Sequence, residues 1–355
     1  MRPAAATRPP RWRRAAVQWI ARLAVIGTLL LAVLHATAYS VEAMSTWWLE
    51  LLQYVPYPAY LLPALAAFGL SFALSRGWRI AAAIGVLLVA TVIMGWVWGQ
   101  PDKGTDPLRL MTYNIKAYQA EHRADGFELL AQEVAQHDPD ILVMQDAGEL
   151  MQRRQREPAL AAGLFDGRQV YAHGQYIVAS RFPLRDCHPG DLAFRGHAFD
   201  YVHCVITVRG MDIDLVTAHL LSPRRGLNAT RHEPVEGIDD WQQNFDDRLK
   251  QARKIAADIA GHARPMILAG DLNAAEASPV IRALLAQGLR DAFSSAGIGY
   301  GYSHGHALRV GFSFLRIDHI LVSPEIGVVD AYPGGWKASE HRPVIADLVL
   351  QRTPR

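Results

Sequence analysis

Long runs of apolar side chains fill the first hundred residues of this 355-residue chain, and they restrict its fold more than any other feature. Three segments, 17–38, 54–74 and 80–98, each approach the roughly 20 apolar residues with which a helix crosses the hydrocarbon core of a bilayer. The third segment holds no charged or strongly polar side chain, which argues against a buried helix of a soluble domain. Residues 1–99 are therefore predicted to form a membrane anchor, a bundle of three transmembrane helices.

Arginine placement predicts the orientation of this anchor, because positively charged flanks of transmembrane helices stay in the cytoplasm. Five arginines precede the first span, and Arg76 and Arg79 lie in the link between the second and third spans. The loop between the first two spans holds Glu42 and Glu50 and no basic residue. Three crossings then place everything after Trp98 on the extracytoplasmic side of a plasma or inner membrane.

The first span also has a feature of a cleaved signal peptide, since residues 36–38 read Ala-Thr-Ala, a small-x-small cleavage pattern. The basic lead before it is long for that role. Cleavage would leave two spans and an external N-terminus, so the rest of the chain is expected outside in either case. The polar link 100–107 reaches at most roughly 26 Å, which is expected to hold the following domain close to the bilayer.

Charge is distributed unevenly along the chain. The whole sequence has 36 basic and 34 acidic residues, but residues 1–100 contain eight arginines, no lysine and two acids. Residues 101–355 therefore hold 28 basic and 32 acidic residues, a formal charge of −4. This balance excludes a domain-wide positive field that attracts nucleic acid, so a nucleic-acid role must depend on local contacts.

Cys187 and Cys204 are the only cysteines, and both belong to the part that is predicted to face an oxidising compartment. A disulfide between them fits that compartment. Two reduced, half-buried thiols fit the sequence equally well.

Residues 108–350 alternate short apolar runs with amphipathic segments, the pattern of an α/β domain. Helices are expected where apolar residues recur at helical spacing, from 127 to 137 and from 245 to 259. The runs 201–208 and 213–218 are joined by a tight link through Arg209-Gly210, so these two runs predict a hairpin. Strands are expected at 108–115, 141–144, 176–179, 201–208, 213–218, 266–269, 317–322 and 344–348.

Polar clusters lie at the ends of these strands, where side chains of neighbouring strands converge on one edge of a sheet. Each cluster alone is weak evidence, because a Gly-Asp-x-Asn turn is more often a hydrogen-bonded cap and a lone histidine is usually structural. Six of them in one domain favour a cleft that carries chemistry. The clusters are Thr112-Tyr113-Asn114, Gln145-Asp146, Thr217-Ala218-His219, Gly270-Asp271-Leu272-Asn273, Arg316-Ile317-Asp318-His319 and Ser339-Glu340-His341-Arg342-Pro343.

In order and spacing, these clusters resemble the motifs of the endonuclease/exonuclease/phosphatase superfamily, which has the deoxyribonuclease-I-like fold. The resemblance covers about residues 108–350 and includes Ser180-Arg181-Phe182-Pro183-Leu184. It implies a four-layer α/β sandwich, in which two mixed sheets pack face to face and helices cover them. It also implies hydrolysis of phosphoester bonds with a divalent cation. Together with the predicted anchor, the chain looks like a membrane-anchored bacterial-type member.

The resemblance assigns the metal site to oxygen ligands. Asn114 and Asp146 look like the metal-site pair, and Glu340 lies at a position that is near the metal in family members. Amide and carboxylate oxygens suit a hard cation such as Mg²⁺ or Mn²⁺, which takes few protein ligands and keeps several waters.

Catalytic roles follow from the same resemblance. Asp271 resembles the aspartate that orients or deprotonates the attacking water, and Asn273 resembles its partner that hydrogen-bonds the phosphoryl group. Asp318 looks like the residue that fixes His341, so that the other imidazole nitrogen faces the phosphate. His219 is expected to donate to a non-bridging oxygen. Either Asp271 or His341 could take the proton of the water.

Two positions depart from the family pattern. The family usually has Glu where this chain has Asp146, and Asp where it has Glu340. One hypothesis is compensation, because a methylene lost on one side of the cation and gained on the other keeps it in place. The alternative is a catalytically degenerate, membrane-anchored binding module of the same fold.

The substrate is predicted only as a class. A phosphodiester is expected, in extracellular nucleic acid, a lipid headgroup or a small phosphoester, and no protein partner is implied. Arg224 and Arg225, which follow His219, either bind phosphate or belong to a solvated loop, and the loop interpretation is favoured. Four aromatic residues precede Arg316, where the family often has a substrate-facing aromatic side chain, and at least two are expected to be ordinary packing.

Overall fold

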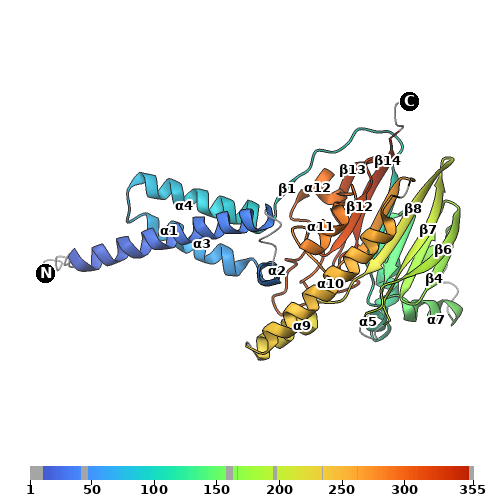
Figure 1. Cartoon of the computed structure of the whole chain (residues 1–355), viewed down its shortest axis with the longest axis horizontal. Helices are drawn as coiled ribbons and strands as arrows, with labels where there is room; N and C mark the ends of the chain where they lie inside the picture. Colours follow the sequence, from blue (N-terminus) through green and yellow to red (C-terminus); the bar gives the residue numbers. More distant parts are fainter. Residues whose placement is uncertain are drawn as a thin grey trace, which may run out of the picture. The chain divides into compact units, whose positions relative to one another are not determined.

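The structure, a computed structural model of the chain, describes residues 11–40, 47–156, 163–165, 167–194, 198–233, 235–261 and 263–351. The chain divides into two compact units, Met1–Trp96 and Val97–Arg355. The first unit is helical in its described part, and the second contains the strands (Figure 1).

Three apolar helices pack together in the N-terminal unit. Its helices are α1 Arg11–Ser40, α2 Trp47–Gln53, α3 Pro58–Ser71 and α4 Arg76–Leu88, and α4 continues as the π-helical turn η2 Val89–Ile93. Val25, Ala67 and Ala82, one from each of the three packed helices, form a buried cluster. Gly85 of α4 lies against Thr28 of α1, because a small residue lets two helices approach closely.

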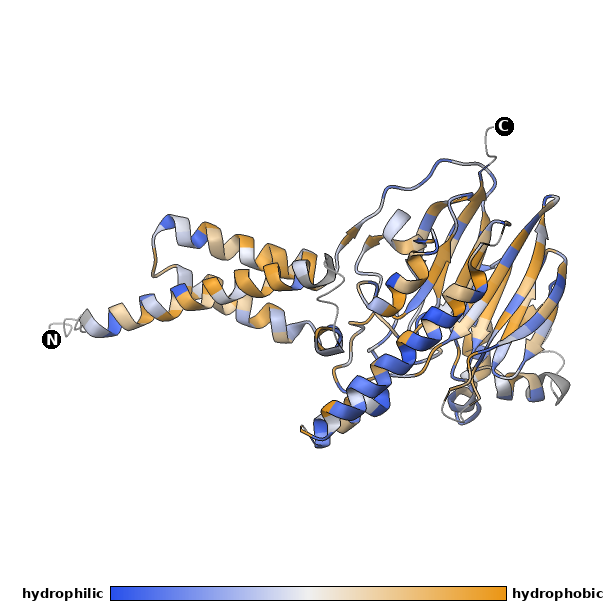
Figure 2. Cartoon of the chain, in the orientation of Figure 1, coloured by the Kyte–Doolittle hydropathy of each residue, from blue (hydrophilic) through white to orange (hydrophobic). Residues whose placement is uncertain are grey.

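Two helices of this unit are long and apolar enough to cross a membrane, Trp12–Thr37 over 26 residues and Arg76–Ile93 over 18 residues. Their outward surfaces are largely apolar (Figure 2). The predicted span 54–74 is wrong in length, because the helix there covers only Pro58–Ser71, with 14 residues. Proline explains the late start of this helix, since a proline ring removes a backbone donor and restricts the preceding residue, and prolines stand at 56 and 58.

The predicted span 80–98 is also displaced along the chain. The helix runs from Arg76 to Ile93, and Val97–Trp98 forms a short strand, β1. The two apolar residues of β1 therefore belong to the second compact unit.

Two six-stranded mixed sheets form the second unit. The first sheet has the order β13-β14-β2-β3-β5-β4 and the second β10-β12-β9-β8-β7-β6. In each sheet one central pair is parallel, β2 with β3 and β8 with β9, and the other pairs are antiparallel. The strands are β2 Leu108–Asn114, β3 Ile141–Gln145, β4 Gln169–His173, β5 Tyr176–Ser180, β6 Leu184–Asp191, β7 Asp200–Val208, β8 Met211–His219, β9 Met266–Asp271, β10 Arg290–Asp291, β11 Ile298–Gly299, β12 Asp318–Val322, β13 Ile326–Pro333 and β14 Val344–Leu350.

The inner faces of the two sheets share one apolar core, which includes Leu110 and Val143 of the first sheet and Leu215 and Ile267 of the second. Helices lie outside the sheets (Figure 1). Phe127 of α6 packs on the outer face of the first sheet, and Tyr201 of β7 donates a hydrogen bond to Asp258 of α10 outside the second. The helices are α5 Ala117–Glu121, α6 Gly126–His137, α7 Gly148–Arg156, α9 Arg224–His232, α10 Gly237–Ile259, α11 Pro279–Leu285 and α12 Ala292–Ala296.

This architecture confirms the prediction of two mixed sheets flanked by helices. Each predicted strand is present, and β7 and β8 form the predicted hairpin. The sequence did not predict β4, β6 or β13. β6 contains Pro189 and several exposed polar residues, since it is an edge strand and needs no apolar alternation. Cys187 of β6 and Cys204 of β7 are joined by a disulfide, so the alternative of two thiols does not describe this structure.

Candidate active site

The central strands of both sheets end in the polar residues that the sequence singled out. Asn114 is the last residue of β2, and Asp146 directly follows β3. In the second sheet, Asp271 at the end of β9 is paired with His219 of β8 on one side and with Asp318 of β12 on the other. Sheet register therefore places these side chains at neighbouring strand ends.

Asp271 is the centre of the cluster. Its Oδ2 accepts a hydrogen bond from Asn114 Nδ2 at 2.9 Å and lies 3.5 Å from His219 Nε2 and 3.7 Å from His341 Nε2. Only 1% of the Asp271 residue surface is exposed. One buried carboxylate thus contacts three polar side chains from both sheets.

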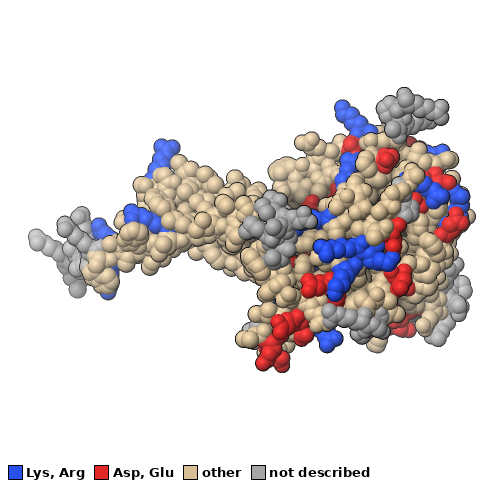
Figure 3. Space-filling view, in the orientation of Figure 1, with Lys and Arg blue, Asp and Glu red and all other residues tan. Residues whose placement is uncertain are grey.

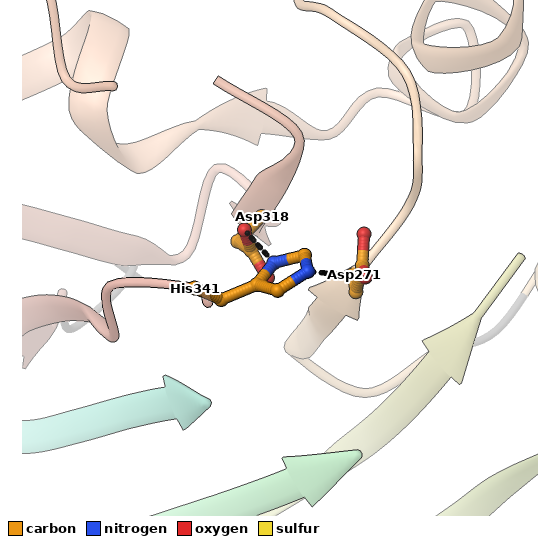
Figure 4. Close-up of side chains that lie close together, drawn as sticks. All are labelled: Asp271, Asp318 and His341. Carbon is orange, nitrogen blue, oxygen red and sulfur yellow. Dashed lines mark hydrogen bonds and ion pairs between the residues drawn. The ribbon is translucent and has the colours of Figure 1, made fainter. Parts of the chain in front are cut away.

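His341 lies between two buried carboxylates, Asp318 and Asp271 (Figure 4). Its Nδ1 is 3.0 Å from Asp318 Oδ2. Burial lowers the pKa of His341 to about 4 and raises the pKa of Asp318 to about 6. At neutral pH the imidazole is therefore uncharged and Asp318 ionised, so Nδ1 donates to Asp318 and Nε2 keeps its lone pair.

Among the described His, Cys, Asp and Glu side chains, only Asp271, Asp318 and His341 form a group able to hold a metal ion. One ligand atom of each lies within 4.8 Å of the others. The expected metal ligands Asp146 and Glu340 do not belong to this group. Asp146 instead pairs with Lys116, whose Nζ lies 2.5 Å from Asp146 Oδ2.

Lys116 was not predicted as a site residue, although it stands only two positions after Asn114. Its backbone N–H donates to Asn114 Oδ1 at 3.2 Å, and its ammonium group reaches Asp146. Burial disfavours ionisation of Asp146, but the charges of His219 and Lys116 outweigh it and hold the Asp146 pKa below its ordinary value. Asp146 is therefore an ionised carboxylate with a built-in counter-ion.

Three non-glycine residues of the site adopt left-handed backbone conformations. The φ angles are 45° at Lys116, 50° at Asp146 and 49° at Asn273. Each follows directly or closely on a strand, where the chain turns sharply away from the sheet. Such conformations are costly for side-chain-bearing residues and are concentrated at functional sites.

Asn273 is held by hydrogen bonds to both side chains and backbone around it. Its N–H donates to Asp271 Oδ1 at 3.0 Å, and its Nδ2 donates to the carbonyl of Leu220 at 2.9 Å. Its own carbonyl accepts a hydrogen bond from Arg248 Nη1 at 2.6 Å. Arg248 is fully buried in α10 and was not predicted.

The two predicted substrate-binding arginines, Arg224 and Arg225, lie in different surroundings. Arg224 lies 3.2 Å from Glu340 Oε2, whereas Arg225 borders a different cavity of about 290 Å³ beside Phe194 and Phe199. The favoured loop interpretation of this segment is wrong, because Arg224–His232 forms helix α9. The structure therefore brings Arg224, but not Arg225, to the metal-site side of the cluster.

His304 is another residue that the sequence did not indicate. Its ring contacts that of His341 in a tilted arrangement, with centroids 4.4 Å apart and an interplanar angle of 37°, and its Nδ1 lies 3.1 Å from the carbonyl oxygen of Glu340. Burial, with the neighbouring His341, lowers the pKa of His304 to about 3. The uncharged ring is thus one of the groups packed against buried His341.

An α/β sandwich that gathers buried aspartate, histidine and asparagine at the ends of its central strands is the arrangement of a phosphoester hydrolase. A model of the Endonuclease/Exonuclease/phosphatase family matches residues 111–341, well over half of the sequence. The chain belongs to this family, whose members hydrolyse phosphoester bonds and generally use divalent metals. The prediction of a hydrolase is confirmed at this level.

Solved structures with the same fold include a family protein from Bacteroides vulgatus, at 17% identity and a TM-score of 0.53, which covers 70% of this chain and 100% of that one. D. rerio TDP2 complexed with single strand DNA product has 16% identity and a TM-score of 0.52, over 69% and 99% of the two chains. A family protein from Beutenbergia cavernae has 19% identity and a TM-score of 0.50, over 69% and 72%. At these identities the likeness shows the fold alone. No curated protein sequence matches the chain.

Proposed function

We propose that this protein is a membrane-anchored, metal-dependent phosphodiesterase whose site lies on the extracytoplasmic side. The observation that carries the proposal is the position of His341, buried between Asp318 and Asp271, with Asn114 and His219 on the same Asp271 carboxylate. This arrangement presents an uncharged imidazole nitrogen and a carboxylate oxygen to one small volume.

The donor set fits a hard divalent cation. Asn114, Asp146 and Glu340 would hold the ion through amide and carboxylate oxygens, which Mg²⁺ and Mn²⁺ both accept. When bound, the ion supplies charge neutralisation at a phosphoryl oxygen. The roles of Asn114 and Asp146 rest on their placement at strand ends, that of Glu340 on its ion pair with Arg224 in the loop before β14, and all three on the family pattern.

The chain's own groups would handle the water and its proton. Asp318 fixes the His341 tautomer, so His341 Nε2 accepts a hydrogen bond from a water that Asp271 also orients. Asn114 stabilises the negative charge of Asp271 by donating to it. His219, 3.5 Å from the same carboxylate, donates to a non-bridging phosphoryl oxygen when its Nε2 carries the proton.

A second candidate function, a binding module without turnover, is favoured by one observation. Lys116 already neutralises the Asp146 carboxylate, which is also the shorter acid relative to the family pattern. A cation held by the chain would reduce the need for a bound metal. The two candidates differ in whether hydrolysis depends on the ion and on Asp271.

Anchoring in a membrane is supported by the distribution of charge on the helical unit. Its basic side chains lie at the end where α1 begins and α3 joins α4, and Gln18 of α1 there donates to the carbonyl of Ala73 (Figure 3). Such a one-sided distribution is typical of a cytoplasmic end. The helix Arg76–Ile93 begins at that end, and the chain after it continues into the second unit.

Among phosphodiesters, long duplex DNA is disfavoured as the substrate. Basic and acidic side chains are interspersed on the visible face of the second unit, and no broad basic groove crosses that face (Figure 3). A duplex needs many phosphate contacts. Single-stranded nucleic acid, a lipid headgroup and a small phosphodiester all remain within this proposal.

The test uses the full chain in detergent with bis-p-nitrophenyl phosphate and, in parallel, p-nitrophenyl phosphate, each with Mg²⁺, Mn²⁺ or chelator. We expect metal-dependent cleavage of the diester that is lost in Asp271→Ala and His341→Ala. His188→Ala, an exposed histidine of β6, is the matched control. Cleavage of the monoester alone would contradict the diester assignment. If the folded chain cleaves neither substrate, with or without metal, the binding module would be favoured.

A further inference from the structure

A short antiparallel strand pair carries an exposed apolar pair on the second unit. β1 and β11 are paired so that Trp98 stands directly opposite Ile298. Directly opposed residues of paired strands project to the same face. Trp98 is 74% exposed and Ile298 is 69% exposed, so the pair presents a large apolar area to solvent.

This apolar surface continues beyond the strand pair. Ile298 borders a cavity of about 580 Å³ whose wall also includes Phe312 and Trp336, and Trp336 is 60% exposed. His306, Gly311, Phe312 and Ser313 form another part of the wall, and the segment between them carries exposed Leu308 and Val310. We call Trp98, Ile298, Leu308, Val310 and Trp336 the apolar face.

The apolar face brings together exposed large hydrophobic side chains, which are usually scattered over the surface of a soluble domain. Eight large hydrophobic side chains of the second unit are exposed in its described part, and five of them belong to this face. Contiguous exposed apolar patches mark interaction sites, whereas scattered ones need no explanation.

Basic side chains accompany the apolar ones. Arg309 stands between Leu308 and Val310, Lys337 follows Trp336, and both cations are exposed. Residues 303–316 and 331–339 contain no acidic residue. Tryptophan and aliphatic side chains flanked by Lys and Arg suit the interface of a bilayer with anionic lipids, where the apolar groups enter the headgroup region and the cations meet phosphates.

We propose that the apolar face docks on the outer surface of the lipid bilayer in which the chain is anchored. The proposal rests on the anchoring proposed above. Only four residues lie between Ile93, the last residue of the apolar helix, and Trp98, so the two residues are at most about 18 Å apart. The covalent chain thus keeps Trp98 near the end of that helix.

Docking in this way would bring the site close to the lipid surface. The cavity of the apolar face shares His306 and Trp336 with a second cavity of about 270 Å³, which is lined by Lys116 and Glu340 of the candidate active site. A phosphodiester at the headgroup level would therefore lie next to the catalytic cluster. This orients the proposed activity toward substrates at the membrane surface.

The test places an environment-sensitive label on the face and on a matched exposed position elsewhere. Trp336→Cys and, as control, Ile238→Cys carry the label in the full chain, reconstituted in nanodiscs of phosphatidylcholine and phosphatidylglycerol. Ile238 is an exposed apolar residue of α10 outside the face. We expect lipid-borne quenchers to reduce the signal at position 336 at least about twofold more than at position 238, as insertion at the interface requires.

Four further results decide the matter. Arg309→Glu with Lys337→Glu should reduce quenching at position 336 in anionic discs more than in neutral ones. Equal quenching at both positions in disc-embedded protein overturns docking and leaves the anchoring intact. Shielding of position 336 that rises with protein concentration, without lipid quenching, overturns it in favour of a second copy. A chain absent from the disc fraction overturns both docking and anchoring, while its diester hydrolysis can still be measured in detergent.

Discussion

Asn114 Nδ2 donates a hydrogen bond to Asp271 Oδ2 over 2.9 Å, and it thereby joins the last residue of β2 in one sheet to the last residue of β9 in the other. The bond is fully buried. It fixes the separation of the two strand ends that carry the candidate metal and water-orienting groups. A single interaction thus couples the packing of the two sheets to the geometry of the site.

Replacing the amide of Asn114 by a carboxylate should weaken the packing of the two sheets and disturb the geometry of the site. Asn114→Asp places a second acid against Asp271 and removes the donor, so we expect a loss of stability of about 1–3 kcal/mol and a fall in kcat of about 100-fold or more. Thermal unfolding and diester hydrolysis of the full chain measure the two effects. Asn228→Asp, an exposed residue of α9, should change neither. Normal turnover in Asn114→Asp would contradict the proposed role of this contact.

Removing the counter-ion of Asp146 should strengthen metal binding. Lys116→Met deletes a positive charge 2.5 Å from the Asp146 carboxylate, and the loss of cation–cation repulsion is expected to tighten Mn²⁺ binding about tenfold or more. Calorimetric titration with Mn²⁺ measures this without any substrate. Lys103→Met serves as control, since Lys103 is exposed. An unchanged dissociation constant would show that the ion does not bind near Asp146.

The exchange of acid lengths at positions 146 and 340 has its own test. If the two exchanges compensate each other, Asp146→Glu and Glu340→Asp each disturb Mn²⁺ affinity and turnover, and the double variant restores both. The expected single-variant loss in turnover is about tenfold, as for a carboxylate misplaced by one methylene. Titration and hydrolysis on all three variants decide this, and singles that behave like the parent chain would rule compensation out.

Most of the fold was predictable, because apolar runs and helical spacing report burial directly. The strand-end residues Asn114, Asp271 and Asp318 could be found for the same reason, since each ends or begins a buried run. Lys116 could not, because its partner Asp146 becomes a neighbour only through the parallel pairing of β2 with β3. Polar edge strands such as β6 lack the apolar alternation that marks a strand in sequence.

Helix lengths and long-range contacts were predicted less well than the strands, because hydropathy does not report helix ends and adjacency in sequence does not report contacts in the fold. The apolar composition of 54–74 suggested a full span, but hydropathy does not register the backbone effect of Pro56 and Pro58, which shorten the helix to Pro58–Ser71. Arg224 and Arg225 are adjacent in sequence, yet in helix α9 Arg224 pairs with Glu340 whereas Arg225 borders the cavity beside Phe194 and Phe199. His304 meets His341 only in the folded chain.

Stability should depend on pH through His304. Burial lowers its pKa from 6.5 to about 3, so between these values the unfolded chain binds more protons than the folded one. Its contribution is therefore fully present above about pH 6.5 and is lost as the pH falls, by about 1.4 kcal/mol per pH unit. His304→Phe keeps an aromatic ring against His341 and should flatten the decline of the unfolding temperature between pH 6.5 and 4. The exposed His232→Phe should not, and equal slopes in all three proteins would contradict the assignment.

Arg248 should act as a positioning residue, because it is fully buried in α10 and its Nη1 donates to the carbonyl of Asn273 at 2.6 Å, while its Nε donates to Asn244. Arg248→Met leaves that carbonyl buried without this donor, so we expect a loss of about 1–3 kcal/mol in stability and a relaxed turn after Asp271. Turnover per folded molecule should fall about tenfold or more with little change in KM.

Arg248→Lys, which retains one donor, should recover part of kcat. Arg253→Met on the exposed side of the same helix is the matched control. Since a purely structural role would lower the folded fraction alone, unchanged turnover in the folded Arg248→Met protein would show that the turn after Asp271 keeps its geometry without this bond.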